Sequence, residues 1–286
     1  MKKNTILVTG ANGQLGMELA VLSKEHPDFQ WIFTDRSTID LANLENIESK
    51  LASYSADILI NCAAYTAVDK AESEVDLADQ INHLAVGKLS DWCFRNTCKF
   101  IHISTDYVFD GTSSVALRED AATAPLNVYG QTKRAGEELC LVNNPDAIIL
   151  RTSWVYSEFG NNFVKTMKKL MHEREELNIV NDQIGSPTYA NDLARAIIQI
   201  IQQERWHAGI YHYSNEGELS WFEFAVKIKE LLGSTCKLNG IPTEAYPTPA
   251  KRPKFSLLDK EKLKETFNAE VPHYLTSLTN CLSKIN

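Results

Sequence analysis

The sequence predicts an α/β protein whose core is a doubly wound parallel sheet, accompanied by a smaller, mixed α/β C-terminal lobe. Three observations support this fold class. Short β-branched runs alternate with helix-length segments over about the first 150 residues, a glycine-rich turn follows the first run, and the alternation fades after about Ser153. Such alternation is typical of βαβ units, whose helices cover both faces of a parallel sheet. We therefore expect a Rossmann-type sheet with a second lobe.

The first half of the chain contains the alternating elements. Each expected strand is a short apolar run rich in β-branched residues, and each expected helix is a longer segment with apolar residues at helical spacing. The expected strands cover 4–9, 31–34, 58–60, 100–103 and 147–150, and the expected helices cover 17–22, 44–54, 75–96 and 129–142. Because helices connect the strands, the strands should run parallel.

The second half is less regular. Helical spacing recurs at 163–171, 192–203 and 221–232, and strand-like runs cover 177–180 and 210–213. Gly240, Pro242 and three prolines between 247 and 253 predict an extended loop, and the last helices should start near Asp259 and Pro272. We expect residues 1–155 and 190–216 to form the sheet lobe and 156–189 and 217–286 to form the second lobe.

Composition excludes several classes of protein. The chain has 286 residues, of which 44% are hydrophobic and 23% charged, enough to bury a large core. Its apolar runs are too short to span a membrane, and the first ends at Gly10, too early for a signal peptide. The net charge of −8 disfavours nucleic acid as a partner, and the six cysteines lack metal-binding spacing. We expect a cytoplasmic protein that binds neither membrane nor nucleic acid.

Gly10, Gly13 and Gly16 recur every third residue between the first strand and the first helix. Without a Cβ, glycine lets backbone N–H groups approach an anion, and the helix N-terminus adds partial positive charge, so this turn suits a pyrophosphate. The intervening Asn12, Gln14 and Leu15 are included in the expected dinucleotide site. The spacing differs from the G-x-G-x-x-G fingerprint and indicates a variant of the dinucleotide fold; a purely structural turn is the alternative.

Asp35 and Arg36 follow the second expected strand. Asp35 lies 19 residues after Gly16, close to the spacing of the acidic residue that binds the ribose hydroxyls of NAD. The adjacent Arg36 could instead pair with the 2′-phosphate of NADP. Cofactor preference therefore stays open, and a strand-end turn is the alternative role for Asp35.

Tyr129 and Lys133 are four residues apart and should project from one face of a helix. Of the ten tyrosines, Tyr129 alone has a lysine four residues later. A nearby ammonium stabilises a phenolate, so Lys133 should lower the pKa of Tyr129 toward the neutral range and make it a usable acid. A solvated helical pair is the alternative.

Thr105 follows the strand expected at 100–103, at the sheet edge where ligands of parallel α/β folds bind. Its hydroxyl could donate to a carbonyl oxygen that gains negative charge, and could align Tyr129. A dinucleotide turn, an acid, its activating cation and a polarising hydroxyl together indicate hydride transfer to or from a carbonyl carbon.

In these residues the chain resembles the extended short-chain dehydrogenase/reductases, and within them the reductases of 4-keto nucleotide sugars. The glycine turn is shared by the whole superfamily, whereas the later motifs are more specific. The resemblance rests on the segments VTGANGQLG (8–16), NCAAYTAVD (61–69), STDYVFDG (104–111), YGQTK (129–133), RTSWVY (151–156), DQIGSPTY (182–189) and RPKFSLLD (252–259).

The resemblance implies specific roles. Tyr129 would protonate the C4 oxygen, Lys133 would hold the nicotinamide ribose, and Thr105 would take the place of the usual serine. NADPH, with NADH as the alternative, would reduce C4 of a dTDP-4-keto-6-deoxy-L-sugar to give dTDP-L-rhamnose. Further residues implied to bind the cofactor are Asp40, Leu41, Ala63, Ala64 and Tyr65, and those implied to bind substrate are Thr105, Asp106 and Trp154. A core tryptophan is the alternative role for Trp154.

The predictions of metal binding and oligomeric state rest on the residues near the C-terminus. Some members of this group dimerise around Mg²⁺ held by acidic residues near the C-terminus, but this sequence has no Asp or Glu after Glu270. We therefore expect no metal, and a monomer or a homodimer. Because the net charge is negative, local cations should hold the substrate phosphates; Lys251, Arg252 and Lys254 are candidates, with a solvated basic loop as the alternative.

Other functions remain open. Related dehydratases carry a carboxylate two residues after the threonine, where this chain has Tyr107, which disfavours dehydration. An epimerase-reductase would need additional Cys and His proton shuttles, which sequence alone cannot place. A non-catalytic NADP-binding module, similar to the regulatory subunit of methionine adenosyltransferase, is an alternative of a different class.

Overall fold

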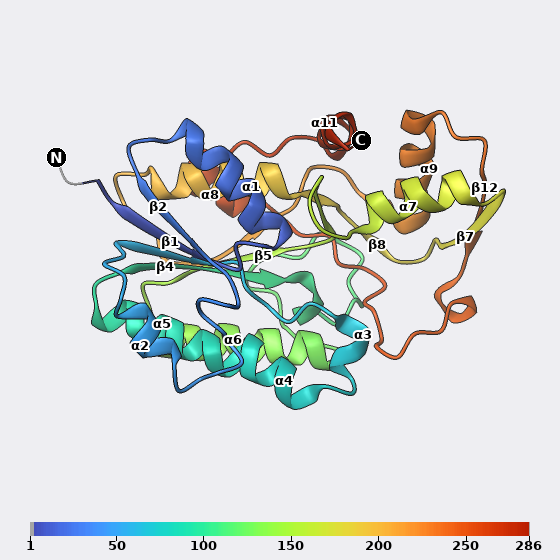
Figure 1. The fold of residues 1–286 in the computed structure, drawn as a ribbon. Coiled ribbons are helices and arrows are strands. Elements are labelled where there is room, and N and C mark those ends of the chain that lie inside the picture. Colours follow the sequence, from blue (N-terminus) through green and yellow to red (C-terminus); the bar gives the residue numbers. More distant parts are fainter. Residues whose placement is uncertain (1–2, 286) are drawn as a thin grey trace.

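The computed structural model describes residues 3–285 and contains a six-stranded parallel sheet (Figure 1). The sheet order is β2–β1–β3–β4–β5–β10. The strands are β1 Thr5–Thr9, β2 Gln30–Thr34, β3 Ile58–Asn61, β4 Lys99–Thr105, β5 Ile148–Thr152 and β10 Gly209–Tyr213. Over the described residues, no helix combines the length and apolar character needed to cross a membrane.

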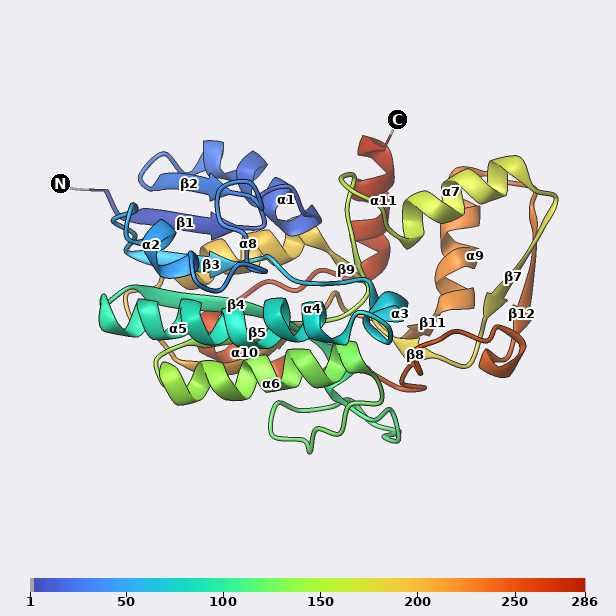
Figure 2. The same ribbon diagram turned by 60° about the horizontal axis from the view of Figure 1, so that its bottom comes forward.

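Helices cover both faces of the sheet (Figures 1 and 2). The first face carries α1 (Gln14–Leu22) and α8 (Ala190–Ile201), and the second carries α2 (Ile47–Leu51), α5 (Ala85–Arg95) and α6 (Val128–Asn143). Successive residues of a strand point to opposite faces. Ile6 and Val8 accordingly join the first cluster, whereas Leu7 joins the second. Burial on both faces explains why β1 is a continuous apolar run.

The doubly wound topology is confirmed. From β1 the chain passes to β2 on one side and then returns to β3 on the other, so the strand order reverses at β1. The carboxyl ends line up, because Thr9 pairs with Thr34 and Asn61, and Asn61 pairs with His102. This switch point is where ligands of open parallel sheets bind.

The helix expected at 75–96 is interrupted. The structure divides it into α4 (Val75–Asp79), a π-helical turn, η2 (Gln80–Leu84), and α5. In the π turn, the Asn82 side chain accepts a hydrogen bond from the Tyr65 N–H at 2.9 Å and donates to the Tyr65 carbonyl at 3.0 Å. Hydrophobic periodicity predicted the long helix but cannot reveal one wide turn inside it.

The second lobe has its own core. It contains α7 (Phe163–Glu173), β7 (Glu176–Val180), α9 (Trp221–Leu232) and α11 (Tyr274–Lys284), packed around Tyr156 and Phe224. Two short strands, β8 (Ile184–Gly185) and β11 (Leu219–Ser220), pair nearby. The segment around Gly240, which the sequence predicted as loop, instead forms β12 (Lys237–Ile241), parallel to β7. Tertiary pairing produces this strand, because its own sequence contains few strand-forming residues.

The chain returns to the sheet lobe twice after residue 189. The first return is α8 and β10, within the range predicted at 190–216. The second is α10 (Glu261–Phe267), whose Leu263 and Phe267 join the cluster of the large sheet. The sequence placed 217–286 in the second lobe, and α10 departs from that boundary because its apolar face packs on β10.

A buried carboxyl group connects the lobes. Glu18 of α1 accepts hydrogen bonds from the Ser157 hydroxyl at 2.6 Å and the Asn191 amide at 2.8 Å. Burial and a hydrogen bond to Glu158 raise the pKa of Glu18 to about 7. Glu158 in turn accepts from Tyr189 at 2.9 Å, so the proton on Glu18 lies within an inter-lobe network.

We predict that stability depends on the proton of Glu18. Because the folded state raises its pKa from an ordinary value of 4.5 to about 7, the stability it provides is complete below pH 4.5 and is lost as the pH rises to 7. Glu18→Gln cannot ionise and should gain about 3 kcal/mol relative to wild type between pH 4.5 and 8. Denaturant unfolding across this range measures the effect. The exposed Glu45→Gln variant should show the same pH dependence of unfolding free energy as wild type. If the Glu18→Gln curve runs parallel to that of wild type, the prediction is refuted.

Gly136 provides a second test of the packing. It lies in α6, and a Cβ built there would overlap the carbonyl oxygen of Asn82. Helix propensity alone predicts that Gly136→Ala stabilises by about 1 kcal/mol, whereas overlap with the backbone predicts a loss of about 2 kcal/mol. We expect the loss, measured as the free energy of unfolding. Gly233→Ala, with positive φ but nothing within 4 Å, is the control and should lose about 1 kcal/mol. A more stable Gly136→Ala protein would contradict this packing.

Candidate active site

A cavity of about 800 Å³ lies at the carboxyl ends of β1, β3 and β4. It brings together most of the cofactor residues expected from sequence. Those lining it are Gly10, Asn12, Gly13, Gln14, Leu15, Asp35, Arg36, Asp40, Leu41, Ala63, Ala64, Tyr65, Tyr129 and Lys133. Gly16, Thr105, Asp106 and Trp154 lie outside this lining. Sequence reasoning missed other lining residues, among them Cys62, Ile103, Ser104 and Thr152.

The glycine turn allows very close backbone packing. Gly10 has a φ of 70°, and a Cβ there would lie 2.7 Å from the Ala63 nitrogen. A Cβ at Gly16 would overlap the Gly10 carbonyl, so Gly16 supports the turn from below the cavity. Helix α1 starts at Gln14 with Gly13 as its N-cap, which leaves first-turn N–H groups available to an anion.

Asp35 and Arg36 lie at the β2 end of the cavity. Asp35 accepts hydrogen bonds from Asn12 at 2.9 Å and from the Ser37 hydroxyl at 2.6 Å, and these bonds lower its pKa. Arg36 is exposed and lies 3.5 Å from Asp40. Asp35 is thus fixed by local bonds, whereas the guanidinium of Arg36 can reach solvent.

Tyr129 is placed by the first turn of α6. The N-cap residue Asn127 accepts a hydrogen bond from the Gly130 N–H at 2.8 Å. Burial raises the pKa of Tyr129 to about 12, although a hydrogen bond with Thr105 opposes this. The expected lowering of the Tyr129 pKa is therefore wrong for this arrangement, because desolvation outweighs the stabilising contacts.

Lys133 is buried one turn further along α6. Its Nζ donates to the Ile103 carbonyl at 2.6 Å and lies 3.2 Å from Nε2 of His102. Burial lowers the pKa of Lys133 to about 8, although the carboxylate of Glu137 opposes this. Its ammonium group is thus directed at β4, which explains why it does not offset the burial of Tyr129.

Two buried oxygens lie unpaired at the end of β4. Within residues 3–285, the Ser104 hydroxyl and Oδ2 of Asp106 have no hydrogen-bond partner. Ser104 lines the cavity, and Asp106 accepts a bond from the Thr105 hydroxyl at 3.1 Å. Burial raises the pKa of Asp106 to about 6. Since buried polar atoms normally have partners, the Ser104 hydroxyl, which lines the cavity, fits a site completed by a ligand.

Trp154 has a strained backbone, with a φ of 50°. Its indole stacks on that of Trp221, with ring centroids 3.7 Å apart and an interplanar angle of 11°. Trp221 begins α9, and Phe163, which begins α7, packs against it at 4.6 Å. Two aromatic residues of the second lobe, Trp221 and Phe163, therefore support Trp154, and the sequence analysis did not identify this contact.

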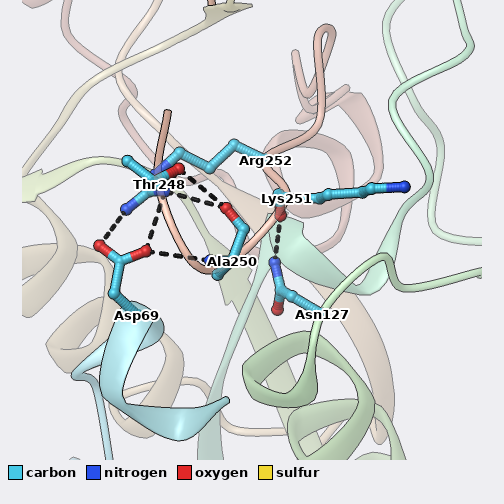
Figure 3. Close-up of polar contacts among 6 residues, drawn as sticks. All are labelled: Asp69, Asn127, Thr248, Ala250, Lys251 and Arg252. Atoms are coloured by element: carbon cyan, nitrogen blue, oxygen red, sulfur yellow. Dashed lines mark hydrogen bonds and ion pairs between the residues drawn. The ribbon is translucent and has the colours of Figure 1, made fainter. Parts of the chain in front are cut away.

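The loop at 248–252 ties the second lobe to the sheet lobe (Figure 3). Arg252 donates to Asp69 of α3 (Val68–Ala71) at 2.7 and 3.1 Å, and Asn127 donates to the Lys251 carbonyl at 2.7 Å. Lys254 pairs with Glu244 at 3.3 Å. Arg252 and Lys254 thus each have a carboxylate partner within the protein, and their role toward the substrate phosphates stays a prediction.

Asn82, His102, Tyr107 and Trp221 are the main site residues that sequence reasoning missed. His102 lies in a strand whose apolar pattern hides it, and Asn82 depends on the π turn. Tyr107 packs edge-on against Tyr129, with centroids 5.5 Å apart. The position of Tyr107 directly after Thr105 and Asp106 was the only sequence feature that could have indicated its place in the site.

Comparisons with known proteins identify the family of this chain. The family of the RmlD substrate binding domain matches residues 4–286. The dTDP-4-dehydrorhamnose reductase of Aggregatibacter actinomycetemcomitans is 41% identical over 285 residues, which cover 96% of this chain and 97% of that one. The spore coat polysaccharide biosynthesis protein SpsK of Bacillus subtilis is 41% identical over 260 residues, which cover 91% of this chain and 90% of that one.

A solved structure is also similar over its whole length. The dTDP-4-dehydrorhamnose reductase of Bacillus anthracis, in complex with NADP, superimposes with a TM-score of 0.93 and 37% identity. The match covers 99% of this chain and 100% of that one. The sequence and the fold therefore agree, and the chain belongs to the dTDP-4-dehydrorhamnose reductase family.

Proposed function

We propose that the protein uses NADPH to reduce the C4 keto group of dTDP-4-dehydro-6-deoxy-L-mannose, giving dTDP-L-rhamnose. The arrangement of α6 is the main support, because it places Tyr129 and Lys133 in the same cavity as the glycine turn. The names of the relatives favour this substrate over those of other enzymes with this fold.

The residues present fit a dinucleotide. The first turn of α1 would bind the pyrophosphate, Asp35 and Arg36 would lie at the adenosine ribose, and the unpaired Ser104 hydroxyl would meet the nicotinamide end. When bound, NADPH supplies the hydride for C4. Lys133 would bind the nicotinamide ribose through the one N–H of its ammonium that faces neither Ile103 nor His102.

Tyr129 would provide the proton at the C4 oxygen. Since burial raises its pKa to about 12, the phenol is fully protonated at neutral pH. Its hydrogen bond with Thr105 orients the phenol. The Thr105 hydroxyl has one proton, which it donates to Asp106 in this structure, so it can donate to the developing oxyanion only by turning away from Asp106. Proton donation becomes favourable as negative charge accumulates on that oxygen.

The sugar would bind between the two lobes. The Asp106 oxygen without a partner can accept a hydrogen bond from a sugar hydroxyl, and the Trp154–Trp221 pair offers an apolar surface nearby. The Arg252–Asp69 pair would hold the 248–252 loop over the site. Sugar recognition thus depends on contacts that join the two lobes.

The proposed reaction predicts a specific loss for Tyr129→Phe. Without the phenol hydroxyl, kcat for the 4-keto sugar nucleotide should fall about 100-fold or more, since general acids contribute at least this much. NADPH oxidation followed at 340 nm measures kcat, and fluorescence titration should show NADPH affinity within about threefold of wild type. Tyr54→Phe, distant from the cavity, is the matched control. If wild type binds NADPH but does not oxidise it with this substrate, the protein is a binding module instead.

Cofactor preference gives a second prediction. Arg36→Ala should weaken NADPH binding about tenfold, because a charge-assisted bond to the 2′-phosphate is lost, and should leave NADH binding unchanged. Titration of the wild-type and variant proteins with both nucleotides measures this. The exposed Arg95→Ala should alter neither affinity. An equal effect on NADPH and NADH would show that Arg36 does not distinguish them.

A further inference from the structure

A buried chain of hydrogen bonds runs from β1 to the catalytic helix beneath the cavity. The Thr9 hydroxyl donates to Oδ1 of Asn61 at 2.6 Å, and Nδ2 of Asn61 lies 3.0 Å from Nδ1 of His102. Nε2 of His102 then lies 3.2 Å from Nζ of Lys133. Thr9, Asn61 and His102 are at most 1% exposed, so water cannot correct a mismatched donor or acceptor.

The orientation of the Asn61 amide is fixed by its neighbours. Oδ1 accepts from the backbone N–H of Ala63 at 3.3 Å as well as from Thr9. A backbone N–H can only donate, so exchanging the amide oxygen and nitrogen would place two donors against each other. Nδ2 of Asn61 must therefore face His102, and it can only donate to Nδ1.

This bond determines the tautomer of His102. Burial and the charge of Lys133 hold the pKa of His102 well below its ordinary range, so the ring is neutral and has one N–H. Since Nδ1 accepts from Asn61, the proton is on Nε2. Nε2–H then points at Nζ of Lys133, and an ammonium there would present a second donor to it.

We propose that His102 is a positioning residue that presents Nε2–H to Lys133 and thereby weakens the hold of Lys133 on its third proton. A neutral amine satisfies every contact: it accepts from His102, donates to Ile103 and keeps one N–H for the cavity. An ammonium can also donate to Ile103 and keep an N–H for the cavity, but it cannot accept the hydrogen bond from His102. The proposal rests on the function proposed above only in assigning Lys133 to the cofactor ribose.

The other charged and titratable groups near Lys133 favour its protonated form or affect its protonation more weakly than His102 does. Glu137 lies one turn further along α6 and favours the ammonium, as does Cys140, two turns on. Glu137 is already neutralised by Arg151 of β5, with atoms 2.7 Å apart. His102 is thus the group in direct contact with Nζ that opposes its charge, and burial adds to this effect.

The first test uses the protein without substrate. Nitrogen-15 NMR of histidine-labelled wild-type protein, with His102 assigned by its substitution, should show a protonated Nε2 and an unprotonated Nδ1. A proton on Nδ1 would overturn the proposal, because Nε2 would then accept from the Lys133 ammonium. This measurement does not depend on turnover, so it can fail while the reductase activity stands, or succeed where activity is absent.

The second test measures the pKa of Lys133 directly. In His102→Gln, a side-chain carbonyl can face Nζ and accept from the ammonium, so the pKa of Lys133, followed by its ¹³Cε shift, should rise by about one unit. The pH at which NADPH binding weakens should rise equally. His212→Gln, another buried histidine of the same sheet, is the control and should not change it. An unchanged or lowered Lys133 pKa in His102→Gln would refute the proposal.

Discussion

Backbone-to-backbone packing of α6 is the constraint on which the rest of the site depends. A Cβ at Gly130 would overlap the carbonyl oxygen of Tyr107, and one at Gly136 would overlap that of Asn82. The helix therefore lies directly against the turn that follows β4, η3 (Asp106–Val108), and against the π turn. Because Tyr129 and Lys133 are on this same helix, their distance from the sheet edge is set by rigid backbone rather than by adaptable side chains.

The chemistry of the site follows from burying charge in this close-packed setting. Lys133 and Asp106 are buried, and burial lowers the pKa of Lys133 to about 8 and raises that of Asp106 to about 6. Both changes move these groups toward the neutral range, where proton transfer is most useful. A chain with a net charge of −8 does not attract anions broadly, so the proposed pyrophosphate site would depend on the α1 N-terminus.

The sequence predicted the features that depend on local pattern. Strand and helix alternation, the Gly10–Gly16 turn and the Tyr129–Lys133 spacing are all read within a few residues, and the structure places them at one cavity. The π turn at Asn82, the β7–β12 pairing and the Trp154–Trp221 stack arise from contacts between distant segments. No local pattern encodes them. The direction of the Tyr129 pKa was wrong because sequence spacing shows the neighbouring cation but not the loss of water.

Asn127 connects the 248–252 loop to the first turn of α6, which carries the proposed acid, Tyr129. Its side-chain oxygen caps the first turn of α6, which carries Tyr129, while its amide nitrogen bonds to the Lys251 carbonyl (Figure 3). Arg252, the next residue of that loop, bonds to Asp69 of the sheet lobe. One asparagine thus joins the second-lobe loop to the turn that positions the acid. A shift of the 248–252 loop would therefore first change the hydrogen bond between Asn127 and the Lys251 carbonyl. The loop is connected to the first turn of α6, which carries Tyr129, through the two hydrogen bonds of Asn127 and not through the hydrophobic core.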